Sequence, residues 1–128
     1  MSAGISTYLA NKLLDHAFRA VTWTPPADIY ARAHTGDPGA NGTANASAQT
    51  ARYKSTWAAA TGGQAAASNA PEIVLNATET ISFISYWDAP TAGNFLFSAT
   101  VAQAKGGVAG DIIRIATAPI ILNPIAAT

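Results

Sequence analysis

The stretch from residue 80 to residue 100, TISFISYWDAPTAGNFLFSAT, constrains the fold of this chain most strongly. Large apolar and small polar side chains alternate on both sides of the segment DAPTAG, and a period of two is typical of β-strands. Asp88, Pro90 and Gly93 in that segment are turn-forming residues. The sequence therefore predicts a β-hairpin with DAPTAG as its loop. Because a lone hairpin is marginal in water, other strands must supply the surface on which it packs.

Other short segments rich in β-branched or aromatic residues lie between turn signals and predict further strands. We expect a mainly β fold of seven to eight short strands, which is typical of an antiparallel β-sandwich or barrel. Lys105-Gly106-Gly107 and Gly110-Asp111 are predicted as turns. Besides the two arms of the hairpin, which continue weakly to residue 104, the expected strands are residues 28–34, 50–58, 72–76, 111–117 and 119–123, and residues 64–69 are expected to be either a short strand or a connector.

One amphipathic helix is predicted near the N-terminus, over residues 6–20. Apolar side chains recur there at i, i+3, i+4 and i+7, with Ser6 or Thr7 as the N-cap. We expect this helix to cover one end of the β-domain, and the alternative is that it docks on a neighbouring subunit. A chain of 128 residues fits one compact domain. Residues 1–128 are therefore expected to form a single domain, with the β-domain over residues 28–123.

Composition excludes several classes of function. Charged residues make up 11% of the chain and the net charge is zero, whereas a nucleic-acid-binding protein needs a basic surface. Low charge also leaves little repulsion between copies, which favours self-association. The sequence has no cysteine, no signal-peptide pattern and no apolar run of the roughly 20 residues that a membrane helix needs. We expect no membrane or nucleic-acid partner, and synthesis in a cytoplasm.

The segment TGDPGANGTANASAQ, residues 35–49, carries no large apolar side chain. It predicts a long loop that is either solvated and flexible or ordered by a partner. Trp23 lies outside any periodic segment and is a candidate interface anchor. The contact elements that we expect are the N-terminal helix, the loop over residues 36–49 and the turn over residues 89–93. The candidate partner contacts are Trp23, Gly36, Asp37, Pro38, Asn41, Asn45, Pro90 and Thr91.

Candidate catalytic and metal-binding groups are sparse. His16 beside Asp15, and His34 near Asp37, are the histidine and carboxylate neighbours, and neither comes with a nucleophile in the sequence pattern. We interpret His16 as a polar-face residue of the helix and His34 as a strand-end residue. The isolated turn aspartates, such as Asp37, are expected to bond their own backbone rather than calcium. The sequence predicts no catalytic residue, no cofactor and no metal site.

Five segments follow one another along nearly the whole chain: IYARAHTGDPG at residues 29–39, ARY at 51–53, TGGQAAASN at 61–69, ISYWDAPTAGNFLFSA at 84–99 and GDIIRI at 110–115. This succession resembles a family of small tailed-bacteriophage virion proteins. Members of that family are labelled capsid decoration (cement) proteins, minor tail proteins or tail-fibre proteins. The resemblance therefore implies a component of the virion.

From this resemblance and the low charge we expect a non-enzymatic capsid decoration protein on the outer capsid surface, which stabilises the shell by burying area across capsomer boundaries. The expected partners are the major capsid protein and further copies of the chain in a homotrimer. The alternative is a minor tail or tail-fibre-associated protein that contacts the host surface through exposed aromatic side chains, which stack well on sugars.

Overall fold

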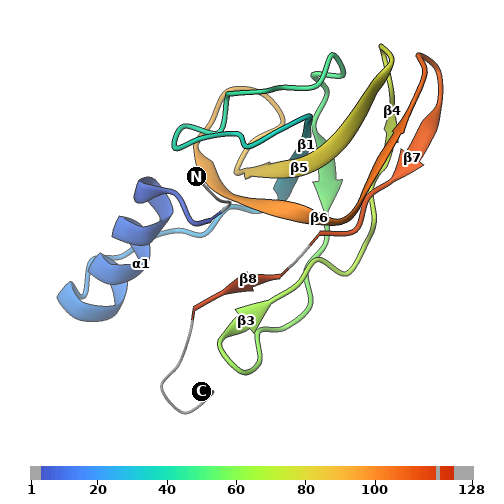
Figure 1. Ribbon diagram of the computed structural model, residues 1–128. Helices are drawn as coiled ribbons and strands as arrows, with labels where there is room; N and C mark the ends of the chain where they lie inside the picture. The colour runs from blue at the N-terminus through green and yellow to red at the C-terminus, as the bar shows by residue number, and fades with distance from the viewer. Residues whose placement is uncertain (1–3, 118, 123–128) are drawn as a thin grey trace.

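The computed structural model describes residues 4–117 and 119–122 and contains one helix and eight strands (Figure 1). The predicted mainly β fold with one N-terminal helix is confirmed. Residue 123 of the expected last strand, and residue 118 between the two expected last strands, lie outside the described residues. The elements are α1 (Thr7–Arg19), β1 (Ile29–His34), β2 (Tyr53–Ser55), β3 (Gln64–Ala65), β4 (Glu72–Val74), β5 (Glu79–Trp87), β6 (Phe95–Gly107), β7 (Ile112–Arg114) and β8 (Ile120–Ile121).

The strands form one four-stranded sheet and two smaller ladders. The order in the sheet is β2-β1-β5-β6, while β4 pairs with β7 and β3 pairs with β8, and every pairing is antiparallel. The predicted central hairpin is confirmed because β5 pairs with β6 from Trp87 and Phe95 onward. Within the described part of the chain, β2 and β6 do not pair with each other. The sheet is therefore open, and the barrel alternative is wrong.

Strand β6 is longer than the sequence predicts. Lys105, Gly106 and Gly107 were expected to form a turn, but they pair with the first residues of β5. Thr80 Oγ1 would lie 2.6 Å from a Cβ atom at Gly106, so the two strands approach too closely there for a larger residue. The glycines mark this close approach rather than a turn. The second predicted turn is confirmed, since Gly110 has φ +93° and leads into β7.

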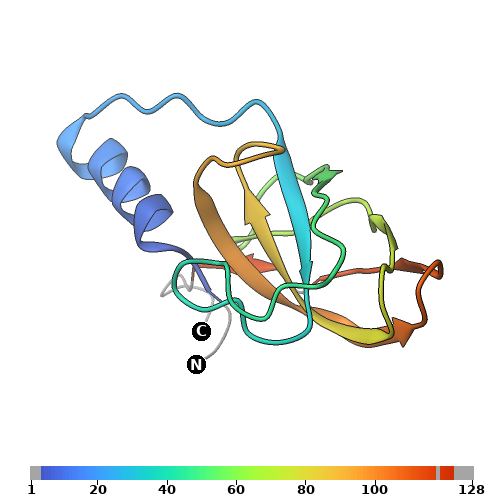
Figure 2. The same cartoon turned by 90° about the horizontal axis from the view of Figure 1, so that it is seen from above.

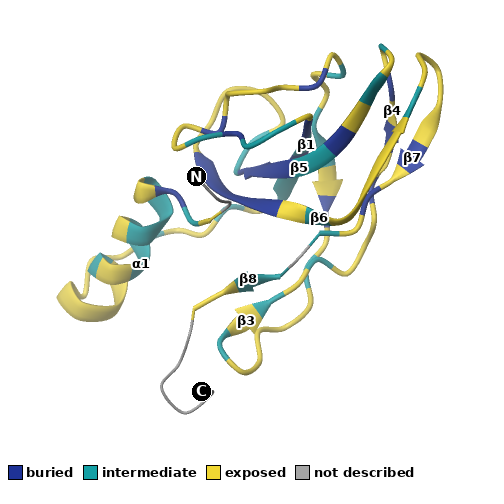
Figure 3. Cartoon of the chain, in the orientation of Figure 1, coloured by how far each residue is buried: buried dark blue, intermediate teal, exposed yellow. Residues whose placement is uncertain are grey.

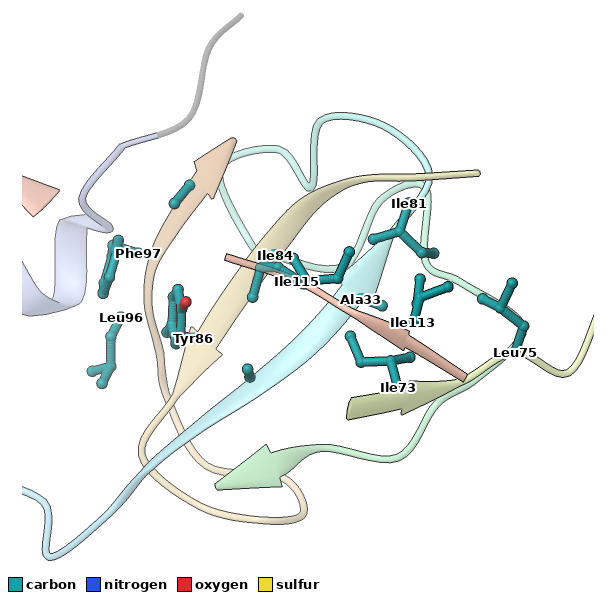
Figure 4. Close-up of a cluster of buried hydrophobic side chains, with 12 residues drawn as sticks. Ala33, Ile73, Leu75, Ile81, Ile84, Tyr86, Leu96, Phe97, Ile113 and Ile115 are labelled. Carbon is teal, nitrogen blue, oxygen red and sulfur yellow. The ribbon is translucent and has the colours of Figure 1, made fainter. Parts of the chain in front are cut away.

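The hydrophobic core lies between one face of the four-stranded sheet and the β4–β7 ladder (Figure 4). Each fully buried aliphatic side chain contributes about 1.5–3 kcal/mol through the area that it removes from water. The rings of Trp57, Tyr86 and Phe97, with centroids 4.7–5.5 Å apart, form an aromatic group that extends the core. The core residues are Ala31, Ala33, Ile73, Leu75, Ile81, Ile84, Tyr86, Leu96, Phe97, Ala99, Ile113 and Ile115.

Helix α1 begins where the sequence predicts, because the Ser6 side chain accepts a hydrogen bond from the Leu9 N–H at 3.0 Å. It stands at one end of the molecule in both views (Figures 1 and 2). None of its 13 residues is buried, and the side chains of Leu14 and Phe18 are 55% and 82% exposed (Figure 3). Only its first turn, through Tyr8 and Leu9, packs against the core. The expected covering of the β-domain by the apolar face of the helix is therefore wrong beyond that turn.

Candidate functional site

The loop over residues 35–49 is ordered by the chain itself. It folds back along β1, with hydrogen bonds from the Thr35 N–H to the Asn45 carbonyl at 2.8 Å and from the Ser47 N–H to the Ala33 carbonyl at 3.1 Å. The Ser47 hydroxyl also donates to the carboxylate of Glu79 on β5. Neither of the two predicted alternatives, a loop left flexible in solvent or one ordered by a partner, describes it. Short-range periodicity could not show these bonds, because they join residues far apart in the sequence.

His34 anchors this loop from inside the sheet. Its ring is fully buried, with Nδ1 2.8 Å from the Ala44 carbonyl and Nε2 2.7 Å from Ser85 Oγ. Trp87 Nε1 donates to the same Ser85 oxygen at 2.8 Å. Every polar atom is satisfied if the neutral imidazole donates through Nδ1 and accepts the Ser85 hydroxyl proton at Nε2. Burial lowers the pKa of His34 below its ordinary value of 6.5, so the neutral form is favoured.

His34 and Ser85 have the side chains of a catalytic histidine–serine dyad, but they lack the accessibility that such a dyad needs. The Ser85 side chain has no exposed surface, and its oxygen already receives the Trp87 N–H. A substrate carbonyl could not reach the oxygen, because Ser85 is fully buried. The pair therefore serves as a structural connection between β1, β5 and the loop, and the strand-end interpretation of His34 missed this connection.

Arg52 fixes the loop of the central hairpin. Its Nη1 donates to the carbonyls of Ala89 at 2.9 Å and Ala92 at 2.6 Å, and its guanidinium carbon lies 4.1 Å from the ring centroid of Trp87. At the base of the same loop, the Asp88 carboxylate accepts from the backbone and side-chain N–H groups of Asn94 at 2.7 and 2.9 Å. Two charged side chains thus hold a loop that would otherwise depend on its turn residues alone.

These connections bring three segments that are distant in the sequence around one groove, with a volume of about 400 Å³. One wall is the start of α1, the second is the tip of the loop over residues 35–49, and the third is the end of the hairpin loop. Trp87 and Phe95 lie between them, with ring centroids 5.5 Å apart. The lining residues are Ser6, Thr7, Tyr8, Ala40, Asn41, Thr43, Trp87, Gly93, Asn94 and Phe95.

Gly42 allows the loop tip to close over this floor. It has φ +73°, and a Cβ atom built on it would lie 2.5 Å from the Phe95 ring. A larger residue would therefore be strained in its backbone and would also clash with the ring. The contact places Asn41 and Thr43, the two neighbours of Gly42, at the rim of the groove.

The structure brings the three predicted contact elements together, which the sequence did not predict. Asn41 lines the groove itself, whereas Pro90 and Thr91 lie on the exposed tip of the hairpin loop. Asn45 is exposed but has φ +52° and donates to the Asp37 carbonyl at 2.9 Å, so it has a structural role in the loop. The proposed contacts of these residues with a partner stay predictions.

The remaining predicted contact residues are less accessible. Pro38 is fully buried and presents no surface to a partner. Gly36 and Asp37 are half-buried, and Asp37 Oδ1 accepts the Gly39 N–H at 2.8 Å, as expected of a turn aspartate. Trp23 is half-buried in the segment between α1 and β1. Tyr8, Thr43 and Asn94 were not predicted as contact residues, although the first two lie in the predicted contact helix and contact loop and Asn94 lies in the hairpin segment.

Two further features are absent from the described ranges, residues 4–117 and 119–122. No three His, Asp or Glu side chains lie close enough together there to hold a metal ion. No helix in these ranges has the length and apolar character to span a membrane.

By its architecture the chain is a small, mainly β protein, with an open antiparallel sheet and one N-terminal helix. The chain belongs to the family of Podophage GP4 fiber I protein gp80, whose family model matches residues 4–123. It is therefore a structural protein of the bacteriophage virion, as the resemblance implied. Comparison with curated proteins finds no match. The family match supports the tail-fibre alternative better than the capsid decoration interpretation.

Proposed function

We propose that this chain is a non-enzymatic subunit of a phage fibre and that it contacts the host surface. The observation that carries the proposal is the match to a fiber protein family over residues 4–123, which spans α1 and all eight strands. A capsid decoration protein was the first expectation, but the family description names a fiber protein.

The arrangement of the loops supports a contact role. The groove opens where the start of α1, the loop over residues 35–49 and the hairpin loop meet. Its rim residues Thr7, Asn41 and Asn94 are exposed. Binding residues are concentrated on loops held by a rigid scaffold, because such loops can vary without loss of the core. The hydrogen bonds of His34 and Arg52 provide that rigidity here.

Quantitative mass spectrometry of purified virions tests the location. A fibre subunit is expected at a copy number far below that of the major capsid protein, and an antibody against the chain should label the tail region in electron micrographs. A copy number equal to that of the capsid protein, with label over the whole head, would overturn the fibre proposal in favour of decoration.

Contact with the host surface is tested separately with the purified full chain. We expect it to bind cells that the phage infects and to reduce phage adsorption when added first. The expected contact with the major capsid protein and the expected homotrimer stay predictions. Co-purification from dissociated virions checks the capsid contact, and sedimentation equilibrium of the full chain checks the oligomer.

A further inference from the structure

We infer that Arg32 on β1, beside Arg52, binds one carboxylate group carried by another protein of the virion. The inference goes beyond the proposed contact with the host surface, because it names a protein partner and a site outside the groove. It is carried by the charge pairing of the whole chain and by the position of Arg32 next to a second arginine.

Arg32 is the basic side chain that has no partner within the described part of the chain. Its guanidinium forms neither an ion pair nor a hydrogen bond there, and its Nε is shielded from solvent. All seven basic side chains of the sequence lie in the described ranges. The others each contact a carboxylate, a backbone carbonyl or an aromatic ring, and they are Lys12, Arg19, Arg52, Lys54, Lys105 and Arg114.

The acidic side chains of the chain are already bonded. All seven lie in the described ranges, and each accepts at least one hydrogen bond or belongs to an ion pair. They are Asp15, Asp28, Asp37, Glu72, Glu79, Asp88 and Asp111. The second oxygen of Asp37 has no partner, but it is shielded from solvent. A second copy of this chain therefore has no spare acidic side chain for Arg32, and the carboxylate comes from a different protein.

Arg32 lies beside another cation at the edge of the β1–β2 ladder. The ladder ends with the pair Ala31 and Tyr53, and the next residues beyond this pair are Arg32 and Arg52. Burial lowers the pKa of Arg52, and the positive charge of Arg32 lowers it further. Like charges in such neighbouring positions on paired strands repel each other. A bound anion would relieve this repulsion.

The local charge suits a ligand with a single negative charge. Asp88 attracts Arg52 and acts on its pKa in the opposite direction, so two arginines and one aspartate leave one positive charge uncompensated. A carboxylate matches that charge, whereas a divalent phosphate exceeds it. The Arg52 Nη1 already donates to the carbonyls of Ala89 and Ala92, so only one guanidinium fork is fully available. One fork is the geometry that binds a single carboxylate.

Partial burial adds to the gain from such a ligand. The side chain of Arg32 is half-buried, and a cation that is partly removed from water without a counter-charge is costly. Only the Nε of its guanidinium is shielded from solvent without a partner, which leaves the two terminal nitrogens for a ligand. A carboxylate bound there would supply the missing counter-charge through charge-assisted hydrogen bonds, the stronger class of hydrogen bond.

The first test asks whether the purified full chain binds a carboxylate at Arg32. Acetate is titrated at pH 7, at constant ionic strength set with sodium chloride, and the arginine Nε–H resonances are followed by nitrogen-15 NMR. We expect a saturable shift of the Arg32 resonance, with a dissociation constant on the order of 10 mM, as suits one charge-assisted pair. Phosphate is the comparator and should bind more weakly than acetate.

Three variants locate the site, and the Nε–H of Arg52 reports binding where Arg32 is replaced. Arg32→Gln removes the charge and should abolish the saturable shift. Arg32→Lys keeps the charge but lacks the planar fork, so it should weaken binding. Arg19→Gln makes the matched change at an exposed arginine that is paired with Asp15, and it should leave binding unchanged. Thermal unfolding of each variant verifies that the fold is retained.

The second test asks whether a virion protein supplies the carboxylate. Phage that encode the Arg32→Gln chain should carry several-fold fewer copies of it than phage with the natural chain, measured by quantitative mass spectrometry of purified particles. Phage that encode the Arg19→Gln chain should carry the natural number. Because both variants are first shown to fold, a difference between them reports the contact of Arg32 in the particle.

Several results would overturn the inference. The carboxylate site is refuted if acetate does not shift the Arg32 resonance, or if the Arg32→Gln chain still shows the saturable shift. Tighter binding of phosphate than of acetate refutes the ligand class. Acetate binding at Arg32 together with full incorporation of the Arg32→Gln chain refutes the protein source, since the ligand would then be a free carboxylate.

Discussion

Acidification should destabilise this protein through His34 before its carboxylates titrate. Burial lowers the pKa of His34 in the folded chain, whereas in the unfolded chain the ring returns to its ordinary value of 6.5. Above pH 6.5 both states hold a neutral ring, and stability does not depend on this group. Below pH 6.5 His34 becomes protonated in the unfolded chain but stays neutral in the folded chain. The free energy of unfolding therefore falls with falling pH.

The linkage between proton binding and folding sets an upper limit on the loss of unfolding free energy through His34. Each pH unit below the unfolded-state pKa removes at most about 1.4 kcal/mol for one group. Between pH 7 and pH 5.5 the loss attributable to His34 is therefore up to about 1.3 kcal/mol. Protonation would also turn Nε2 into a donor facing a Ser85 oxygen that already receives the Trp87 N–H. The hydroxyl proton of Ser85 would then need a new acceptor inside the core.

Urea denaturation followed by tryptophan fluorescence measures this effect at several pH values. The matched variant is His34→Gln, which keeps a donor and an acceptor but does not titrate. It should be less stable than the natural chain at pH 7, and the difference should shrink as the pH falls to 5.5. Parallel pH profiles for the two proteins over that window would refute the argument, because the other titrating groups are common to both.

Four further substitutions test particular contacts. Arg52→Ala should lower the free energy of unfolding in urea by about 1–3 kcal/mol, because it removes two charge-assisted hydrogen bonds and a cation over an indole ring. Gly42→Ala should cost about 2 kcal/mol more than Gly62→Ala in the same assay, since both glycines have positive φ but only the first would clash; equal losses would contradict the ring contact. Ile84→Ala should cost about 2–5 kcal/mol in thermal and urea unfolding, and a much smaller loss would contradict its place in the core. Phe18→Ser should change the free energy of unfolding by less than about 0.5 kcal/mol, because the ring is 82% exposed; a larger loss would mean that it packs on the domain.

The sequence predicted those elements whose signal is local. The central hairpin follows from alternation on both sides of a turn segment, and α1 follows from its period and its cap at Ser6. Strand β6 was predicted too short, because glycines at 106 and 107 can mean either a turn or a close strand contact. Only the partner strand decides between these alternatives, and the partner lies more than 20 residues away in the sequence.

The groove was harder to predict than the fold. All three of its walls belong to elements that were expected to contact a partner, but their meeting depends on bonds such as those of His34 and Arg52 across the sheet. Such bonds join residues that have no fixed spacing in the sequence, so no sequence pattern predicts them. Arg52 in particular lies in the short segment ARY, and nothing in that segment predicts that its side chain holds the hairpin loop.

Helix α1 and the β-sheet of this chain should differ in their resistance to unfolding. The helix supplies none of the buried core residues, and beyond its first turn it has little packing to stabilise it. An isolated helix of this length is marginal in water, so its backbone hydrogen bonds should open far more often than those of β5 and β6. Because the core does not depend on α1, the helix can unwind and reform while the sheet stays folded. The wall that its first turn contributes to the groove is thus built on the least cooperative element of the chain.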